Sequence, residues 1–516
     1  MGLAGFFLVT DAWERFLVKH GILPKPDYNN PADSRDIPLV LADRCFCKPE
    51  GGSKVARIHF DPFDHDGYLG SIPVCNGMAF PKLEVKARKY RLRLLNGALA
   101  RVHLLELWDA GEIAEGANLD ELFSDAGKDG HPYRIEKAWH RIGKDSWMTE
   151  RPVKDSSILL AMADRADVIV DFKVLLKGRK KATFFLVNVC DQRNGRGPGH
   201  GDNGLADADG AGTTNRPRGD RENVPRLDDV DRQVEFSVNE GGPTWGTLKV
   251  LRIDVTAVAG ADPCSFTGDL STLKTLLARP DIQAEIAADP QLAEQAGLHL
   301  RKHDNLMETL TWEQIRKLPQ RRFDFERGKG AWRVSHRFFD ERRADAPVVL
   351  GSLEVWRLVN RSGGWWHPIH IHLESHQQIV VEFDGTKRSR KDRSGAHYSD
   401  KHTKDLLPHD RYKHDTAILG PNTEILLLMR FRTFLGPFVF HCHNLNHEDM
   451  LMMSTFDPRL ESLGDHPKEE HPPQRVPMAG PMIPEKLMHE QIDGKFHPLP
   501  SGMKTSVQQM FGDECH

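Results

Sequence analysis

Apolar and polar residues alternate with a period of two along much of this chain. The clearest run extends from Lys82 to Leu94, and similar strand-like runs cover residues 37–44, 56–60, 157–162, 167–172 and 182–189. Alternation of this kind is typical of a β-strand with one buried and one exposed face. Because such runs dominate and turn-rich segments connect them, the pattern predicts an all-β protein made of sandwiches or barrels.

Four segments depart from the strand pattern and divide the chain. Residues 24–36, rich in Pro, Asn and Asp, predict a linker. Residues 192–229 are rich in Gly, Asp, Asn and Arg, which predicts a flexible insertion. Within residues 261–320 leucines recur at helical spacing and alanine-rich stretches follow, so we expect a helical insertion or linker. The tail, residues 459–516, has weak periodicity and is expected to be extended or disordered.

The first residues of the chain are apolar as well. The run from Phe6 to Thr10 is interpreted as a buried β-strand. It is not a secretory signal peptide, because no basic residues precede it and no small-residue cleavage site follows. The compartment in which the protein works is therefore left open by the sequence.

Composition excludes several classes of function. The 516 residues include 70 basic and 74 acidic ones, a net charge of −4, which argues against a nucleic-acid partner. Only 39% of the residues are apolar, and no run approaches the roughly 20 that a membrane span needs. Seven scattered cysteines do not form a disulfide scaffold. The 26 histidines stand out, since imidazole is the commonest metal-binding side chain.

Two histidine-rich motifs carry the chemistry. The first runs from His367 to His372 and contains His370, and the second is His441-Cys442-His443 with a further histidine, His447, four residues on. Successive side chains of a strand point to opposite faces. In the first motif His370 and His372 therefore share a face that His367 does not. In the second, the two histidines that flank Cys442 share a face and the cysteine points away.

This arrangement predicts two metal sites back to back. On one side lie Cys442, His367 and His447, with Met452 within reach of an axial position. Two His, one Cys and a weak Met form the ligand set of a blue-copper electron-transfer site. On the other side, four imidazoles form part of a multi-metal site, and they belong to His370, His372, His441 and His443. A single His-x-His pair arises by chance in a histidine-rich chain. Two such pairs, of which one has a Cys as its middle residue, are not explained by chance.

The sequence resembles the multicopper oxidases, and in particular the group that contains spore-coat laccase, bilirubin oxidase and phenoxazinone synthase. The matching stretches are Gly2–Val9, Asp36–Phe46, Asn76–Arg101, Leu350–His372 and Leu419–Met453. The resemblance implies cupredoxin-like Greek-key β-sandwiches, and the helical insertion predicted from the leucine spacing then lies between the second and third domains. By this match residues 1–23 are a remnant of the first cupredoxin domain, residues 37–260 form the second, and residues 321–458 form the third, which carries the copper motifs.

The resemblance also implies a role for each motif residue. His367, Cys442, His447 and axial Met452 match the ligands of a type 1 copper. His370 matches a ligand of the type 2 copper, and the type 3 pair is matched by His372, His441 and His443. Glu448 matches an acidic residue that helps deliver protons to reduced oxygen, and electrons enter near His447. Cys442, His447 and Glu448 are thus the candidate catalytic residues.

The sequence departs from the family in one respect. A full trinuclear copper cluster takes eight histidines from four His-x-His pairs, and this sequence contains two pairs. The other two belong to the first domain, of which only a remnant is expected. Three explanations compete: a start codon assigned too late, so that an upstream segment is missing, a first domain supplied by a partner chain, or a degenerate copper protein.

Two functions follow from these observations. One is a laccase-like, copper-dependent oxidoreductase. It would oxidise small-molecule electron donors (phenolic, aminophenolic, pyrrolic or metal-ion) one electron at a time and reduce dioxygen to water. The alternative is a non-catalytic type 1 copper protein, which carries electrons or binds copper and has a degenerate trinuclear site.

Overall fold

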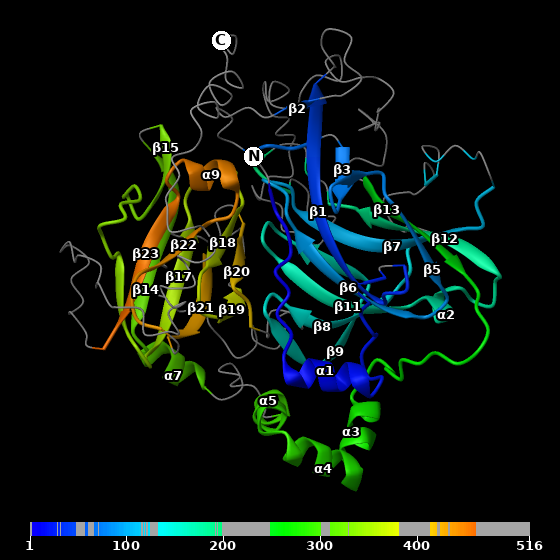
Figure 1. Cartoon of the computed structure of the whole chain (residues 1–516). Coiled ribbons are helices and arrows are strands. Elements are labelled where there is room, and N and C mark those ends of the chain that lie inside the picture. The colour runs from blue at the N-terminus through cyan, green and yellow to red at the C-terminus, as the bar shows by residue number, and fades with distance from the viewer. Residues whose placement is uncertain are drawn as a thin grey trace, which may run out of the picture.

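In a computed structural model of the chain, two β-sandwiches lie side by side with a group of short helices at one end (Figure 1). The structure describes residues 3–47 except 28 and 31, 57–59, 67–114 except 71, 117, 119, 122–123, 133–190, 192, 195–198, 248–300, 310–380 except 329, 413–420, 424–431 and 434–460. Most of the predicted insertion at 192–229 and nearly all of the tail from 459 lie outside these residues. The all-β prediction is confirmed.

The strands of the first sandwich run from β1, which begins at Asp36, to β13, which ends at Thr256. Its larger sheet has the order β4-β3-β1-β6-β11-β8-β9, with β2 paired to β1, and its smaller sheet the order β10-β7-β12-β13-β5. The strands are β1 (Asp36–Cys47), β2 (Arg57–His59), β3 (Ile72–Cys75), β4 (Met78–Ala79), β5 (Lys82–Lys86), β6 (Lys89–Asn96), β7 (His103–Gly111), β8 (Trp139–Lys144), β9 (Trp147–Asp155), β10 (Ser157–Leu160), β11 (Arg165–Asp171), β12 (Lys181–Asn188) and β13 (Leu248–Thr256), with the short helix α2 (Phe172–Leu175) after β11.

The second sandwich begins at residue 320. One sheet has the order β15-β14-β17-β21-β19 and the other β16-β23-β22-β18-β20. Its strands are β14 (Gln320–Gly328), β15 (Ala331–Val334), β16 (Ala346–Val349), β17 (Leu353–Asn360), β18 (His367–Ile371), β19 (His376–Val380), β20 (Thr416–Leu419), β21 (Glu424–Arg430), β22 (Phe438–Cys442) and β23 (Met453–Arg459). Trp356, Phe440 and Phe456 are fully buried between the two sheets, and the Trp356 ring packs against both phenylalanines. This core fixes the strands that carry both histidine motifs.

Strand β6 shows how the alternating pattern forms the first sandwich. Leu92 and Leu94 are fully buried in the core between its sheets. The intervening Arg91 and Arg93 point away from the core and form ion pairs that include Glu14 (2.9 and 2.6 Å). Because Glu14 belongs to helix α1 (Ala12–Lys19), these ion pairs attach the N-terminal helix to the outer face of the sheet.

Helices α3 (Ser271–Leu277), α4 (Pro280–Ala288) and α5 (Pro290–Leu300) follow the first sandwich in the chain, and α7 (Trp312–Lys317) precedes the second. The first three pack with α1 around a separate apolar cluster that includes Trp13, Phe16 and Ile282. No helix in the described part of the chain is long and apolar enough to span a membrane.

The strand predicted for Phe6 to Thr10 is wrong. Residues 3–11 have no regular secondary structure and run between the two sandwiches to α1 (Figure 1). The period of two survives as a burial pattern, since Phe6 and Leu8 are half-buried whereas Phe7 and Val9 are exposed. Among the described residues no strand pairs with this segment, and a strand without a hydrogen-bonded neighbour is not stable.

Burial of His103 makes the stability of the fold depend on pH. This side chain, at the start of β7, is fully buried, and burial, with Arg101 nearby, lowers its pKa from 6.5 to about 3. The folded state thus keeps the imidazole neutral, while the unfolded chain takes up a proton as the pH falls below 6.5. This contribution to stability is present above pH 6.5 and is lost towards pH 3, by about 1.4 kcal/mol per pH unit.

We therefore expect the melting temperature of the metal-free protein to fall between about pH 7 and pH 5, and to fall less steeply in the variant His103→Gln. Thermal unfolding at several pH values measures both slopes. Only the slopes are compared, because the substitution also changes packing. Equal slopes in the two proteins would contradict the assignment.

Candidate metal centre

Strands β18 and β22 are antiparallel neighbours in one sheet, and their register places the two motifs side by side. Ile369 lies opposite Cys442, and His370 lies opposite His441. Ile369 and Cys442 are buried in the core of the second sandwich, whereas the His370 side chain on the other face is partly exposed. The sheet therefore separates the cysteine from the paired histidines, as the spacing of the motifs predicts.

On the core side, three donor atoms converge. Cys442 Sγ lies 3.4 Å from His367 Nδ1 and 3.6 Å from His447 Nδ1, and the two nitrogens are 3.1 Å apart. All three side chains are fully buried. Within the part of the chain that the structure describes, no other set of three His, Cys, Asp or Glu side chains brings its donor atoms within 4.8 Å of one another.

The loop after β22 brings His447 to this position. Asn444 caps the single helical turn α9 (Leu445–Asp449), which turns the chain back so that His447 faces Cys442. Two backbone hydrogen bonds close the loop: the Cys442 amide donates to the Met452 carbonyl (3.0 Å), and the Met452 amide donates to the His447 carbonyl (3.1 Å). Met452 is fully buried in the same core as Cys442. Its role as an axial ligand stays a prediction.

The tautomer of His367 follows from its hydrogen bonds. The side-chain amide of Asn360 donates to the carbonyls of Trp365 and Gly420, so its oxygen is the acceptor for the Ser362 hydroxyl at 2.6 Å. The Ser362 oxygen must then accept a hydrogen from His367 Nε2 at 2.8 Å. This leaves a bare lone pair on Nδ1, the nitrogen that faces Cys442 and His447. The donor set thus fits a metal ion that prefers nitrogen and thiolate ligands.

Aromatic rings enclose the three donors. The Trp332 ring lies 4.0 Å from the His447 ring and 5.3 Å from the His367 ring, and the Phe325 ring lies 6.5 Å from that of His367. Burial lowers the pKa of His367 to about 3 and raises the pKa of the Cys442 thiol. The imidazole is therefore neutral and able to bind a metal at neutral pH, and a metal ion must displace the thiol proton when it binds.

The four histidines on the other face gather without converging on a point. The ring centres of His370 and His372 are 4.8 Å apart, and those of His441 and His443 are 5.4 Å apart. One pair of ring nitrogens, His372 Nε2 and His441 Nε2, lies 3.2 Å apart. Burial lowers the pKa of each of these four histidines for which a shift is resolved, to about 3 for His441 and about 4 for His372 and His443.

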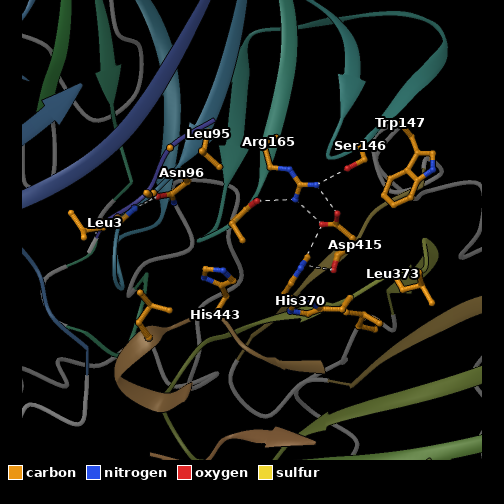
Figure 2. A pocket seen from close by; sticks show the side chains of 18 residues that line it. Leu3, Leu95, Asn96, Ser146, Trp147, Arg165, His370, Leu373, Asp415 and His443 are labelled. Atoms are coloured by element: carbon orange, nitrogen blue, oxygen red, sulfur yellow. Dashed lines mark hydrogen bonds and ion pairs between the residues drawn. The ribbon is translucent and has the colours of Figure 1, made fainter. Parts of the chain in front are cut away.

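A cavity of about 550 Å³ opens beside these histidines (Figure 2). His370, His372 and His443 line it on the side of the second sandwich, and Leu3 and Gly5 of the N-terminal segment line it as well. Among the described residues His443 Nδ1 is buried with no hydrogen-bond partner. An orphaned imidazole nitrogen beside a cavity is compatible with a metal ligand.

Glu448 lies where the sequence suggested an acidic residue. It belongs to α9, and its Oε1 is 3.8 Å from His441 Nδ1. Burial, with a smaller contribution from Asp449, raises the pKa of this carboxyl. A raised pKa makes a carboxyl a better proton donor near neutral pH.

Sequence reasoning missed the residues that contact the motif histidines and orient their rings. Ser362 and Asn360 precede the first motif and set the tautomer of His367. Asp415 contacts His370 and forms an ion pair with Arg165 of the first sandwich (Figure 2). Ordinary Ser, Asn and Asp residues in strand-rich sequence carry no spacing signal, and Arg165 is 205 positions before His370, so no local pattern could have linked them.

Comparison with known proteins finds one matching family and several relatives. The family model described as "Multicopper oxidase" matches residues 314–461, which contain both motifs. A laccase from Haloferax volcanii is 27% identical over 88% of this chain and 56% of its own length. A bilirubin oxidase from Albifimbria verrucaria is 23% identical over 88% of this chain and 57% of its own length. The chain thus spans somewhat more than half the length of these two relatives.

Among solved structures, a variant of the McoA multicopper oxidase from Aquifex aeolicus aligns over 87% of this chain and 69% of its own, with 17% identity and a TM-score of 0.51. A likeness at this identity bears on the fold. The fold is similar to that of a multicopper oxidase, and the buried His-Cys-His set could hold a metal ion. More specifically, the match over residues 314–461 and these relatives make the chain similar to the multicopper oxidases.

Proposed function

We propose that this chain is a copper-dependent oxidoreductase of the laccase type, which takes single electrons from small-molecule donors. The convergence of Cys442, His367 and His447 carries the proposal, because this buried ligand set is typical of type 1 copper. Met452 is the proposed axial ligand. Copper bound there would accept one electron at a time from a phenolic, aminophenolic, pyrrolic or metal-ion donor and supply it for the reduction of dioxygen to water.

The surrounding residues prepare this site before any metal binds. Ser362 fixes the His367 tautomer, and Trp332 covers both imidazoles and keeps water out. A rigid, dry site needs little reorganisation when its charge changes by one electron. Cys442 is joined through the backbone to His441 and His443, so the thiolate of one donor set is covalently continuous with two imidazoles of the other.

On the cavity side, we propose His370 as a type 2 copper ligand and His372, His441 and His443 as type 3 ligands. Glu448, with its raised pKa beside His441, is the proposed proton donor. Four imidazoles are too few for three copper ions, so further ligands are needed. An upstream segment or a partner chain would supply them across the cavity that Leu3 and Gly5 also line.

One observation favours the alternative, a type 1 copper protein that does not reduce dioxygen. The donor atoms of His367, Cys442 and His447 all lie within 4.8 Å of one another, but no three donor atoms of the four cavity histidines do. Both functions share the type 1 site, and they differ in whether the electrons reach dioxygen.

The shared claim is tested without oxygen. Copper-loaded protein should be intensely blue, and anaerobic addition of a phenolic donor should bleach the colour as the copper is reduced. Stopped-flow absorption measures the rate. Protein that binds copper but is colourless, or blue protein that no donor bleaches, would contradict the proposal.

A further inference from the structure

Asp415 is held between the two sandwiches by a pair of hydrogen bonds from one arginine. It directly precedes β20 of the second sandwich and is 7% exposed. Arg165, the first residue of β11 in the first sandwich, donates from Nη1 to Oδ1 (2.8 Å) and from Nη2 to Oδ2 (2.6 Å) of its carboxylate. The same guanidinium donates to the Ala163 carbonyl and the Ser146 hydroxyl, both at 3.0 Å, so its orientation is fixed (Figure 2).

The backbone of Asp415 is also held from the first sandwich, by the carboxylate of Asp145. Asp145, whose side chain is fully buried, accepts the Asp415 amide at 2.9 Å on Oδ2 and the Arg165 amide at 3.1 Å on Oδ1. Asp415 is therefore fixed at its amide and at its carboxylate by groups that belong to the other sandwich.

Asp415 in turn determines which nitrogen of His370 carries the hydrogen. His370 Nδ1 lies 3.1 Å from the Asp415 carbonyl and 3.4 Å from its Oδ1. The Thr416 hydroxyl, 3.2 Å from Nδ1, itself donates to Asp415 Oδ1 and so presents its oxygen to the ring. All three neighbours are acceptors, and Nδ1 must be the protonated nitrogen. Nε2 is the nitrogen left with a lone pair.

We propose that Arg165 and Asp145 are positioning residues for His370: from the first sandwich they hold Asp415, which keeps His370 in the Nδ1–H tautomer and leaves Nε2 for copper at the cavity. The inference rests on the proposed function for the identity of the metal, but the tautomer does not depend on it. Outer groups of this kind orient a metal-binding imidazole and raise its basicity. If Arg165 and Asp145 act in this way, the tautomer of His370 at the cavity depends on how the two sandwiches are docked.

The test is the tautomer of His370 in the metal-free full chain. Long-range proton–nitrogen NMR spectra of protein labelled with ¹⁵N-histidine distinguish the two tautomers, and the His370→Gln spectrum identifies the signals of His370. In the unsubstituted protein the Nδ1–H form should exceed the Nε2–H form by about tenfold or more. In Arg165→Met this ratio should fall by about tenfold, and in Arg165→Lys by less, because lysine keeps the charge but not the paired contact.

Arg179→Met is the matched control, because Arg179 forms a similar two-point contact with Asp109 (2.9 and 2.7 Å) within the first sandwich. It should leave the His370 signals unchanged. An unchanged tautomer ratio in Arg165→Met, an equal change in Arg179→Met, or an Nε2–H form in the unsubstituted protein would overturn the inference.

A copper titration of the same proteins keeps the two proposals apart. The blue absorption reports on the His367, Cys442 and His447 site and should be the same in all of them. If no blue colour develops in the unsubstituted protein, the proposed function fails while the NMR result still decides the role of Arg165.

Discussion

A polypeptide consisting of residues 1–516 alone, fully loaded with copper, should consume no dioxygen above background with a phenolic donor, although the donor still bleaches its blue colour. The reason is the number of ligands. Four imidazoles shared among three copper ions leave each ion under-coordinated, and groups such as Asp415 that only orient a ligand cannot replace one. Copper analysis should give about one copper ion per chain, bound at the type 1 site, and little more.

We then expect a polypeptide with two further His-x-His pairs to raise the copper content and to produce oxygen uptake. It can be fused upstream or supplied as a partner. An oxygen electrode and metal analysis measure both quantities. A partner in which those histidines are replaced by Gln is the control, since it can still cover the cavity without supplying ligands. If residues 1–516 alone bind four copper ions and turn over dioxygen, ligands outside the two motifs complete the cluster and the ligand count is wrong.

Replacing Cys442 by Ser should abolish the blue colour completely. The colour arises from charge transfer between a thiolate and Cu(II), and a hydroxyl cannot supply it. Cys442 Sγ lies 3.4 Å from His367 Nδ1 and 3.6 Å from His447 Nδ1. Among the described residues no other cysteine belongs to such a set of donor atoms, so no second thiolate can replace it. Absorption spectra of the copper-loaded variant measure the effect.

Cys75→Ser is the matched control for this substitution. Cys75 is buried, like Cys442, but lies in the core of the first sandwich. Both substitutions place a hydroxyl in a core and cost stability, so thermal unfolding of the two variants shows whether loss of colour follows loss of fold. A Cys442→Ser protein that stays blue, or a Cys75→Ser protein that is folded and colourless, would rule out Cys442 as the ligand.

The sequence predicted the sheets well because the side-chain period of a strand is a local property. Strand β6 alternates Leu92 and Leu94 with Arg91 and Arg93, and the structure buries the leucines in the core between the sheets. The polar face is not exposed as a half-buried strand would predict, because both arginines are buried in ion pairs with Glu14. The same reasoning failed for residues 6–10, where a period of two is present without a neighbouring strand to pair with. The domain boundaries stay predictions.

The site could be predicted in part for the same reason. Spacing within one strand separated Cys442 from His441 and His443, and the structure places Cys442 and His441 on opposite faces of β22. The groups that orient the histidines could not be predicted, because they depend on contacts between distant segments. Arg165 and Asp415 meet only after two sandwiches have folded and docked.

The most direct test of the account is the position of copper in a crystal of the loaded protein, found from anomalous scattering at the copper absorption edge. The account predicts a strong peak among His367 Nδ1, His447 Nδ1 and Cys442 Sγ, on the core side of β18 and β22. A well-ordered site at those three residues with no copper peak, in crystals whose protein contains copper, would contradict it.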